Sequence, residues 1–389
     1  MMKSISRAAI FALIAGIASL ANTRDSNGQP APPDVVRIKT VDGLSLWGKW
    51  FQGGKGNKSD TVLMVHGYGQ QCSKGAWEDL AIALQKEDFS VLMLDLRGHG
   101  ESAKNRALVD WSAFCDQSYN KLSGYQLNPK ANTQEIKREK PFQPGYFPYL
   151  INDLAGARRF IDTKNDSGHC NSGRIFIISE GSISPLIMMA ASIEYLRNAV
   201  FAAVVGANVP EHPGGSDIAG LIFLSWSSSA MPGHASALTV MNNVWRQPEV
   251  WQTKKTVYEQ MKDRVSMMWV YSKEDTASAR EARAWFTKFG IAGTKKEDTQ
   301  LRKYMTEVPA EKLVGIKMMD VLVDEKIKKK VNDKEEEIVV KVPIVQQHII
   351  SFIKGTVDNG KNGDIHKVRN VATEKLDRVP LELWGLRNP

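Results

Sequence analysis

The chain has 389 residues, of which 42% are hydrophobic and 24% are charged. This composition is typical of a globular protein with a substantial core and excludes a disordered or low-complexity chain. The formal net charge is +8, but the basic residues are scattered, and the lysine-rich stretch at 326–330 is followed by acidic residues. We therefore expect a solvated surface and no nucleic-acid partner.

The first 21 residues have the pattern of a secretory leader. Two cations, Lys3 and Arg7, precede an apolar stretch at 8–20, and Ser19 and Ala21 are small residues at the −3 and −1 positions of a cleavage site. The apolar stretch is short for a membrane span. We expect an exported protein, periplasmic or secreted, with no stable membrane span once the leader is removed.

After a proline-containing lead-in at 22–33, strands and helices alternate. Apolar runs bounded by turn residues predict strands, and apolar residues at helical spacing predict helices. We expect strands at 35–40, 44–51, 61–65, 90–96, 175–178, 218–226, 265–272 and 301–308, and helices at 77–84, 150–161, 186–205, 235–262, 277–289 and 344–353. This alternation predicts an α/β domain at 34–354, with a mostly parallel sheet and helices on both faces.

Three parts of the chain fit this alternation less well. Asp42-Gly43 between the first two strands is a strong hairpin signal, so these strands are expected to be antiparallel. Residues 103–149 are irregular and are interpreted as an insertion. Residues 312–341 mix apolar and charged residues without a clear period, and 355–389 is a mostly polar C-terminal extension.

Two buried strands end in motifs. The sequence VLMVHGYG ends in His66-Gly67-Tyr68-Gly69, and about 25 residues later SVLMLDLRGHGES ends in a turn at 97–102. This pair of motifs resembles the α/β-hydrolase superfamily, closest to its serine esterase, monoglyceride-lipase and serine-aminopeptidase branch. The resemblance covers roughly 35–353. It implies the α/β-hydrolase fold and, where the catalytic site is intact, hydrolysis of a carboxylic ester or a peptide.

The resemblance also assigns an oxyanion hole, in which two N–H groups bind the oxyanion of an acyl-transfer reaction. The turn His66-Gly67 would supply the first N–H group, from Tyr68, and Ser182 would supply the second. Two such donors can lower the barrier by several kcal/mol. His99 is expected to be a structural turn residue.

The superfamily's catalytic triad has the chain order Ser, Asp or Glu, His. Asp275 follows the strand at 265–272 through a short turn and matches the acid. In an active enzyme it would orient and stabilise the imidazole. The same residue is also well placed to cap the helix that starts near 277, and the two roles are compatible.

The nucleophile position is occupied by an unsuitable residue in the favoured alignment. The stretch RIFIISEGSISPLIMMAA, residues 174–191, is typical of a strand, a sharp turn and a helix, which is how this superfamily presents its nucleophile. The favoured register places Gly181 there, and glycine cannot attack a carbonyl. Registers with Ser179 or Ser182 remain open. Glu180 offers a carboxylate, but it lies one residue from the attacking position.

A histidine is also missing where the resemblance expects one. The loop after the last strand, 309–320, reads PAEKLVGIKMMD. His348, in the final helix, is the best remaining candidate for a general base. His212 and His234 precede Asp275 and are therefore out of order. Without a Ser–His pair, the usual route of acyl transfer loses the activation of its nucleophile.

The motifs predict no cofactor and no metal, because neither a glycine-rich phosphate loop nor a metal-ligand cluster is present. The three cysteines, Cys72, Cys115 and Cys170, fit no metal motif, and their odd number leaves at least one unpaired. The sequence favours an exported pseudo-hydrolase that binds an ester- or peptide-like small molecule, or a partner. The alternative is an active ester or peptide hydrolase that uses Ser179 or Ser182 with Asp275 and His348.

Overall fold

The structure is a computed structural model. It describes residues 31–73, 75–104, 109–123, 142–196, 214–228, 234–247, 255–289, 303–309, 313–331 and 334–358. The predicted leader at 1–21 lies outside these residues, as does most of the C-terminal extension. None of the described helices is both long and apolar enough to cross a membrane. The three cysteines are free thiols, with Cys115 exposed and the other two buried.

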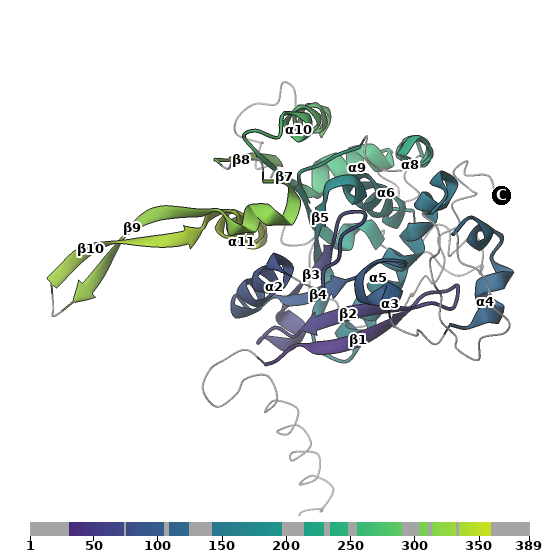
Figure 1. Cartoon of the computed structure of the whole chain (residues 1–389), viewed down its shortest axis with the longest axis horizontal. Helices are drawn as coiled ribbons and strands as arrows, with labels where there is room; N and C mark the ends of the chain where they lie inside the picture. Colours follow the sequence, from purple (N-terminus) through teal and green to yellow (C-terminus); the bar gives the residue numbers. More distant parts are fainter. Residues whose placement is uncertain are drawn as a thin grey trace, which may run out of the picture.

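Eight strands form one sheet in the order β1-β2-β4-β3-β5-β6-β7-β8 (Figure 1). The first two strands form an antiparallel hairpin, β2 pairs antiparallel with β4, and the remaining pairs are parallel. The strands are β1 (Asp34–Lys39), β2 (Ser45–Phe51), β3 (Asp60–Val65), β4 (Ser90–Leu94), β5 (Asn171–Glu180), β6 (Ile218–Leu224), β7 (Ser266–Ser272) and β8 (Lys303–Val308). This confirms the expected α/β-hydrolase fold with its leading hairpin.

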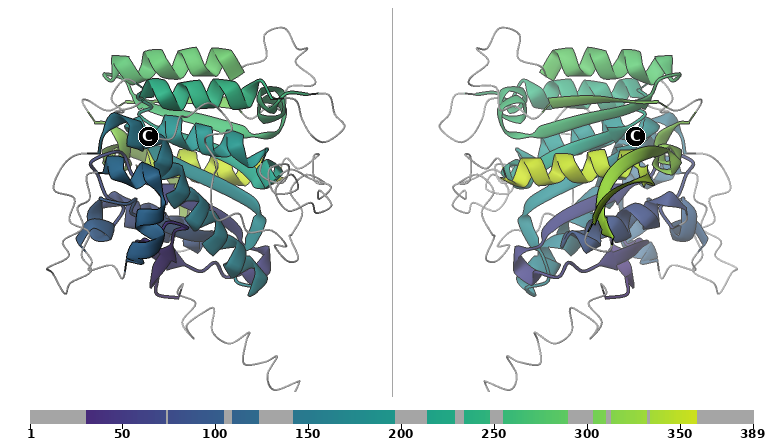
Figure 2. Two further views of the ribbon diagram at one scale, coloured as in Figure 1. Left: turned by 90° about the vertical axis from the view of Figure 1, so that its right-hand side faces the viewer. Right: turned by 90° about the vertical axis from the view of Figure 1, so that its left-hand side faces the viewer.

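Helices cover both faces of the sheet (Figure 2). One face packs against α5 (Ile151–Asp166), α6 (Ser184–Glu194), α8 (His234–Trp245), α9 (Val257–Arg264) and α10 (Thr276–Phe289). The other packs against α2 (Ala76–Lys86), the 3₁₀ helix η6 (Gly315–Asp320) and α11 (Ile344–Asp358). Alternate residues of β3 serve the two cores, Leu63 the first and Met64 the second, as a strand buried on both faces requires.

Two helix predictions are wrong in extent. The pattern predicts one helix at 235–262, but α8 ends at Trp245 and α9 begins at Val257. A capping box explains the new start, because the Thr256 side chain accepts from Glu259 N and the Glu259 carboxylate accepts from Thr256 N. The helix predicted at 186–205 ends at Glu194, and its remainder beyond 196 lies outside the described residues.

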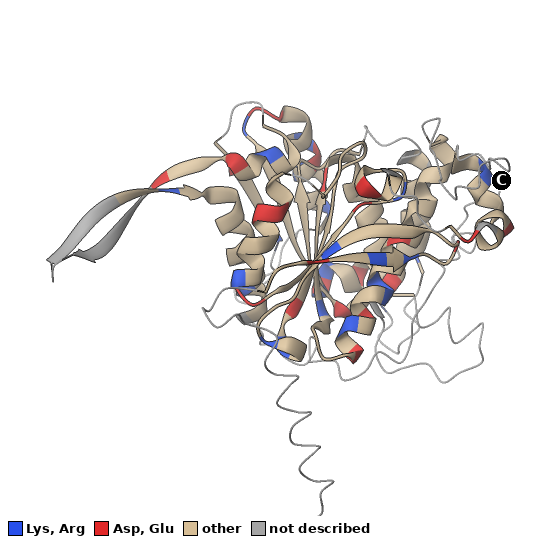
Figure 3. Ribbon diagram, turned by 60° about the horizontal axis from the view of Figure 1, so that its bottom comes forward, with Lys and Arg blue, Asp and Glu red and all other residues tan. Residues whose placement is uncertain are grey.

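Residues 312–341, whose pattern predicts no regular element, contain most of a two-stranded antiparallel ribbon. Its strands are β9 (Leu322–Val331) and β10 (Lys334–Pro343). The ribbon extends away from the body of the molecule (Figure 1). Over the described body, basic and acidic residues are interspersed in the view of Figure 3.

Within the insertion, the described residues form α3 (Gly100–Lys104), α4 (Trp111–Asp116) and the 3₁₀ helices η2 (Ser118–Ser123) and η3 (Pro144–Leu150). Further 3₁₀ turns are η1 (Gly56–Lys58), η4 (Gly181–Ile183) and η5 (Gly214–Asp217).

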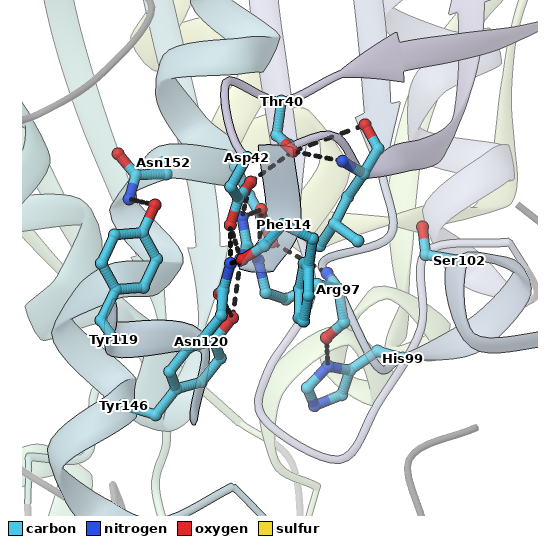
Figure 4. Close-up of polar contacts among 12 residues, drawn as sticks. Thr40, Asp42, Arg97, His99, Ser102, Phe114, Tyr119, Asn120, Tyr146 and Asn152 are labelled. Carbon is cyan, nitrogen blue, oxygen red and sulfur yellow. Dashed lines mark hydrogen bonds and ion pairs between the residues drawn. The ribbon is translucent and has the colours of Figure 1, made fainter. Parts of the chain in front are cut away.

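One buried arginine ties the insertion to the sheet (Figure 4). The Arg97 guanidinium, from the turn after β4, donates to Asp42 Oδ2 at 2.5 Å, to Asp153 Oδ1 at 2.7 Å and to the Tyr146 hydroxyl at 2.7 Å. Burial by itself would raise the pKa of Asp42, but the ion pair with Arg97 brings that pKa below its ordinary value. The Asn120 amide donates to the same Asp42 carboxylate, which links η2 to the hairpin turn.

Candidate functional site

The elbow between β5 and α6 has glycine at its tip. Gly181 adopts φ +55°, a left-handed conformation that costs other residues about 1–2 kcal/mol. Its carbonyl accepts a hydrogen bond from Ser227 N at 3.2 Å, which fixes the tip to the loop after β6. A Cβ built on Gly181 would have Ser225 O, at 4.0 Å, as its nearest neighbour. The elbow therefore has room for a side chain that this chain does not supply.

The two serines next to this tip have different surroundings. Ser179 is fully buried within β5, and its Oγ lies 3.1 Å from Ser184 Oγ in a hydrogen bond. Ser182 is in the 3₁₀ turn η4 and is 9% exposed. Among the described residues, no hydrogen bond joins either hydroxyl to a histidine.

The turn after β3 is held by a neutral histidine. Leu96 N donates to His66 Nε2 at 3.1 Å, and His66 Nδ1 lies 2.7 Å from Gly67 O. These partners require a proton on Nδ1 and none on Nε2. Complete burial lowers the pKa of His66 to about 4, which keeps the ring neutral. His66 thus joins the two motif-bearing turns and shapes them.

Asp95 makes a second connection between these turns. Its carboxylate accepts from Cys72 N at 2.6 Å and from Glu101 N at 2.8 Å. Burial raises the pKa of Asp95, while these backbone N–H donors oppose that rise. Gly100 fits directly against it, because a Cβ on Gly100 would lie 2.1 Å from Asp95 Oδ2. The motif residues at 97–102 therefore have packing roles that need no catalysis.

Aromatic residues gather beside the proposed oxyanion turn. The half-buried Tyr68 ring lies 4.6 Å from the Phe147 ring of the insertion and 5.1 Å from the His99 ring. Phe142, also from the insertion, packs 6.2 Å from His99. Offset and edge-on contacts at these distances are favourable. The insertion thereby covers the end of β3 next to the elbow.

Glu180 is the residue that sequence reasoning undervalued. It is 8% exposed, and its Oε1 accepts from Ile316 N at 3.2 Å. Its Oε2 accepts from Gly67 N at 3.4 Å, a long hydrogen bond. Burial raises the pKa of Glu180, while the N–H groups of Ile316 and Gly67 oppose that rise. One carboxylate thus connects the elbow to both the turn after β3 and the segment after β8.

That segment after β8 is where the resemblance expects a catalytic histidine. Gly315, with φ +62°, packs against the Glu180 carboxylate so closely that a Cβ would lie 1.7 Å from Oε1. Gly315 N donates to Ser225 Oγ at 2.8 Å. The backbone N–H groups of Gly315 and Ile316 therefore tie this segment to Ser225, just after β6, and to the Glu180 side chain at the elbow. We refer to Glu180, Gly67, Ser225, Gly315 and Ile316 as the Glu180 clasp.

Asp275 and His348 are not brought together. Asp275 Oδ1 accepts from Ser278 N at 3.1 Å, so Asp275 caps α10. Its Oδ2 is buried and has no hydrogen-bond partner among the described residues. His348 is exposed on α11, whose buried face is formed by Val345 and Ile349. In the part of the chain that is described, no group of three or more potential metal ligands is found.

A clue to the clasp is present in the sequence. A carboxylate at the end of a buried strand requires partners, and Gly315 marks a close approach of the backbone. However, Glu180 and Ile316 are 136 positions apart, so the sequence does not show that they meet.

Comparison with known proteins gives a partial match. Residues 56–121 match the family described as serine aminopeptidase, S33, and this region includes both turn motifs. No curated protein matches the chain. Three solved structures are similar at low identity. A Pyrococcus furiosus esterase is 12% identical, with 83% of this chain and 90% of that chain covered and a TM-score of 0.43.

The other two are similar to a comparable degree. The dienelactone hydrolase from Anabaena variabilis is 12% identical, with 71% of this chain and 85% of that chain covered and a TM-score of 0.39. The esterase Est22, solved with p-nitrophenol, is 14% identical, with 78% and 80% covered and a TM-score of 0.39.

Proposed function

We propose that this chain, which has the fold of the α/β-hydrolase superfamily, is a binding protein that does not hydrolyse esters or peptides. The observation that carries this proposal is the Glu180 clasp. In an acyl-transfer enzyme the turn after β3 presents N–H groups to a developing negative charge. Here the Glu180 carboxylate approaches the same turn, since Oε2 accepts from Gly67 N.

A carboxylate in this place opposes the chemistry. When it is ionised it repels a developing oxyanion, and its hydrogen bond holds Gly67 N, one residue before the Tyr68 N–H that the resemblance assigns to the oxyanion. Gly181 adds no nucleophile at the tip of the elbow. The hydroxyl of Ser179 is buried against Ser184, where a substrate carbonyl has no access. Serine catalysis needs a base placed next to the serine and stabilisation of the oxyanion. The arrangement of these residues supports neither.

The ligand we propose is a small ester- or peptide-like molecule, or a partner presenting such a group, bound beside Tyr68. This ring is half-buried, and the insertion supplies Phe142 and Phe147 nearby. Aromatic rings of this kind favour a ligand with apolar substituents. We also infer, from the leader pattern, that the protein acts after export. The N-terminal residue of the mature protein tests this inference, and Asn22 is expected.

A fluorophosphonate probe tests the absence of catalysis. We expect the purified chain to remain unlabelled under conditions that label an active serine esterase, and to release no p-nitrophenol from p-nitrophenyl butyrate above the buffer rate. Mass spectrometry of the chain after exposure to the probe identifies any adduct. Labelling that disappears in Ser179→Ala or Ser182→Ala would overturn the proposal in favour of an active serine hydrolase.

A further inference from the structure

A small groove lies between helices α5 and α6 and is lined by residues of both helices. Its volume is about 40 Å³. A water-sized group needs about 10–15 Å³, so the groove has room for about three such groups. On β5 it is lined by Ile175 and Ile177, which precede the elbow. Among the described residues, neither Tyr68 nor a member of the Glu180 clasp lines the groove. It is therefore separate from the proposed ligand site beside Tyr68.

The spacing of residues on the two helices explains the groove. Residues three or four positions apart lie on the same face of a helix. The lining residues of α5 follow this spacing from Ile151 to Arg158, and those of α6 follow it from Ile187 to Glu194. Alanines stand in the middle of both series, at Ala155 and Ala190. Because an alanine side chain is a single methyl group, the space between the helices stays unfilled.

The floor of the groove is the sheet itself. Leu63 of β3 and Ile177 of β5 are paired neighbours, and both line the groove. Ile177 is 8% exposed although β5 lies between β3 and β6, whereas its neighbour Leu221 on β6 is fully buried. The groove thus reaches the centre of the sheet. Apart from Arg158 and Glu194, its described lining residues are all aliphatic, which favours an aliphatic group over water.

The charge of Arg158, at one end of the α5 series, is already balanced. Its Nε donates to Asp162 Oδ1 at 3.2 Å, and its Nη2 donates to Asp217 Oδ2 at 2.5 Å. Burial by itself would lower the pKa of Arg158, but Asp162, Asp217 and Glu194 raise it above its ordinary value. A ligand anion at this end would meet three carboxylates and one guanidinium. The groove therefore disfavours a carboxylate or a phosphate.

One donor of this arginine is available to a ligand. Arg158 is 7% exposed, and its buried Nη1 has no hydrogen-bond partner in the part of the chain that the structure describes. A buried donor without a partner is costly, and an oxygen atom of a ligand would satisfy it. Because the guanidinium charge is balanced, the neutral oxygen of an alcohol or a carbonyl group suits this donor better than a carboxylate does.

We propose that the groove between α5 and α6 binds a small, uncharged aliphatic molecule that carries one oxygen acceptor. Its hydrocarbon part lies over Leu63 and Ile177, and its oxygen accepts from Arg158 Nη1. The groove is a second ligand site of this chain. Its assignment is independent of the proposed function.

Methyl NMR of the full chain, with ¹³C-labelled isoleucine and alanine methyl groups, tests the proposal. The probe is 1-propanol, added up to about 100 mM, because a ligand of four heavy atoms is expected to bind in about the millimolar range. The methyl signals of Ile177 and Ala190 should shift and reach saturation. Propionate has the same carbon chain with a carboxylate in place of the alcohol. It should need at least about a tenfold higher concentration for the same shift.

A variant that fills the groove adds a second measurement. The test variant is Ala190→Leu, which places a larger side chain between the helices. The matched control is Ala284→Leu, the same change at an exposed position of α10. Circular dichroism checks that both variants fold. The Ile177 signal should no longer respond to 1-propanol in the test variant and should respond as in the wild type in the control.

The two titrations of the wild type decide the proposal even where the test variant does not fold. The proposal is overturned if 1-propanol causes no saturable shift at Ile177, or if propionate is as effective as the alcohol. A folded Ala190→Leu variant that keeps the wild-type response at Ile177 would also overturn it. A shift of the Tyr68 amide without one at Ile177 would locate binding at the proposed ligand site and would overturn the second site alone.

Discussion

Replacement of Glu180 by alanine tests the clasp on which the proposed function depends. The change removes the acceptor of two hydrogen bonds, from Ile316 N at 3.2 Å and from Gly67 N at 3.4 Å. A buried N–H group left without a partner costs about 1–3 kcal/mol. The longer bond contributes less than the shorter one. The variant no longer buries a carboxylate, and the absence of that desolvation cost offsets part of the loss. We therefore expect the variant to lose about 1–2 kcal/mol of stability at pH 7.

The pH dependence has a defined sign. Burial raises the pKa of Glu180 above its usual 4.5, so the folded state binds more protons than the unfolded state between the two values. The stability that this group contributes is therefore complete below pH 4.5 and is lost as pH rises through the folded pKa. Glu180→Ala lacks this dependence. The stability difference between wild type and variant should accordingly be larger at pH 4.5 than at pH 7.

Urea unfolding at both pH values measures this difference, and hydrogen exchange of the Ile316 amide measures the local opening. Faster exchange at Ile316 is expected in the variant. Glu281→Ala is the matched control, because Glu281 also accepts from a loop backbone, at Ser228 N, and makes no hydrogen bond to the described residues of the segment after β8. If Glu180→Ala and wild type agree within about 0.5 kcal/mol and exchange alike at Ile316, the clasp does not hold this segment.

Four further predictions follow from the same geometry. Gly315→Ala should destabilise the chain by about 3 kcal/mol or more in thermal unfolding, because its Cβ would fall 1.7 Å from Glu180 Oε1 at a positive φ; a neutral effect would contradict the packing. Gly181→Ser should lower the free energy of unfolding by only about 1–2 kcal/mol, because the elbow has space for the side chain. The variant should still not react with a fluorophosphonate, because no base lies next to the new serine, and strong labelling would show a working base. Arg97→Met should lower the free energy of unfolding by about 3–5 kcal/mol, because Asp42 and Asp153 would lose their buried partner. Urea unfolding measures this loss, and a loss below about 1 kcal/mol would contradict the prediction. Burial lowers the pKa of His66 to about 4, so the free energy of unfolding should fall by about 3 kcal/mol as pH drops from 6.5 to 4. Urea unfolding of His66→Gln should show a flatter dependence on pH, and an unchanged dependence would contradict this role of His66.

The features that the sequence predicts well are those encoded locally. A continuous apolar run such as that of β3 specifies a strand buried on both faces, and Asp42-Gly43 specifies a hairpin. The glycines of the turn after β4 also match their local role, because Gly98 and Gly100 both adopt a positive φ. Fold and topology follow because each local preference agrees with the global arrangement.

The features that the sequence misses depend on distant contacts or on mixed patterns. The pattern at 235–262 does not reveal the capping box at Thr256, which begins a second helix. The sequence does not predict the ribbon, because both of its strands carry charges on both faces, which masks the two-residue period. Its pairing becomes evident only when Ile327 is seen opposite Ile338.

The residues that meet at the elbow are separated in sequence and are brought together by the sheet. Glu180 cannot be interpreted from its own neighbours, because its partners come from the turn after β3 and the turn after β8. A buried carboxylate persists only where donors surround it, and backbone N–H groups supply those donors here. An oxyanion site is also a set of N–H groups in a water-poor pocket. Backbone N–H groups of this kind can equally donate to a carboxyl group of the chain, although burial outweighs them at Glu180 and raises its pKa. Under the proposed function, this is the physical reason why the elbow of this fold would hold a buried carboxyl group.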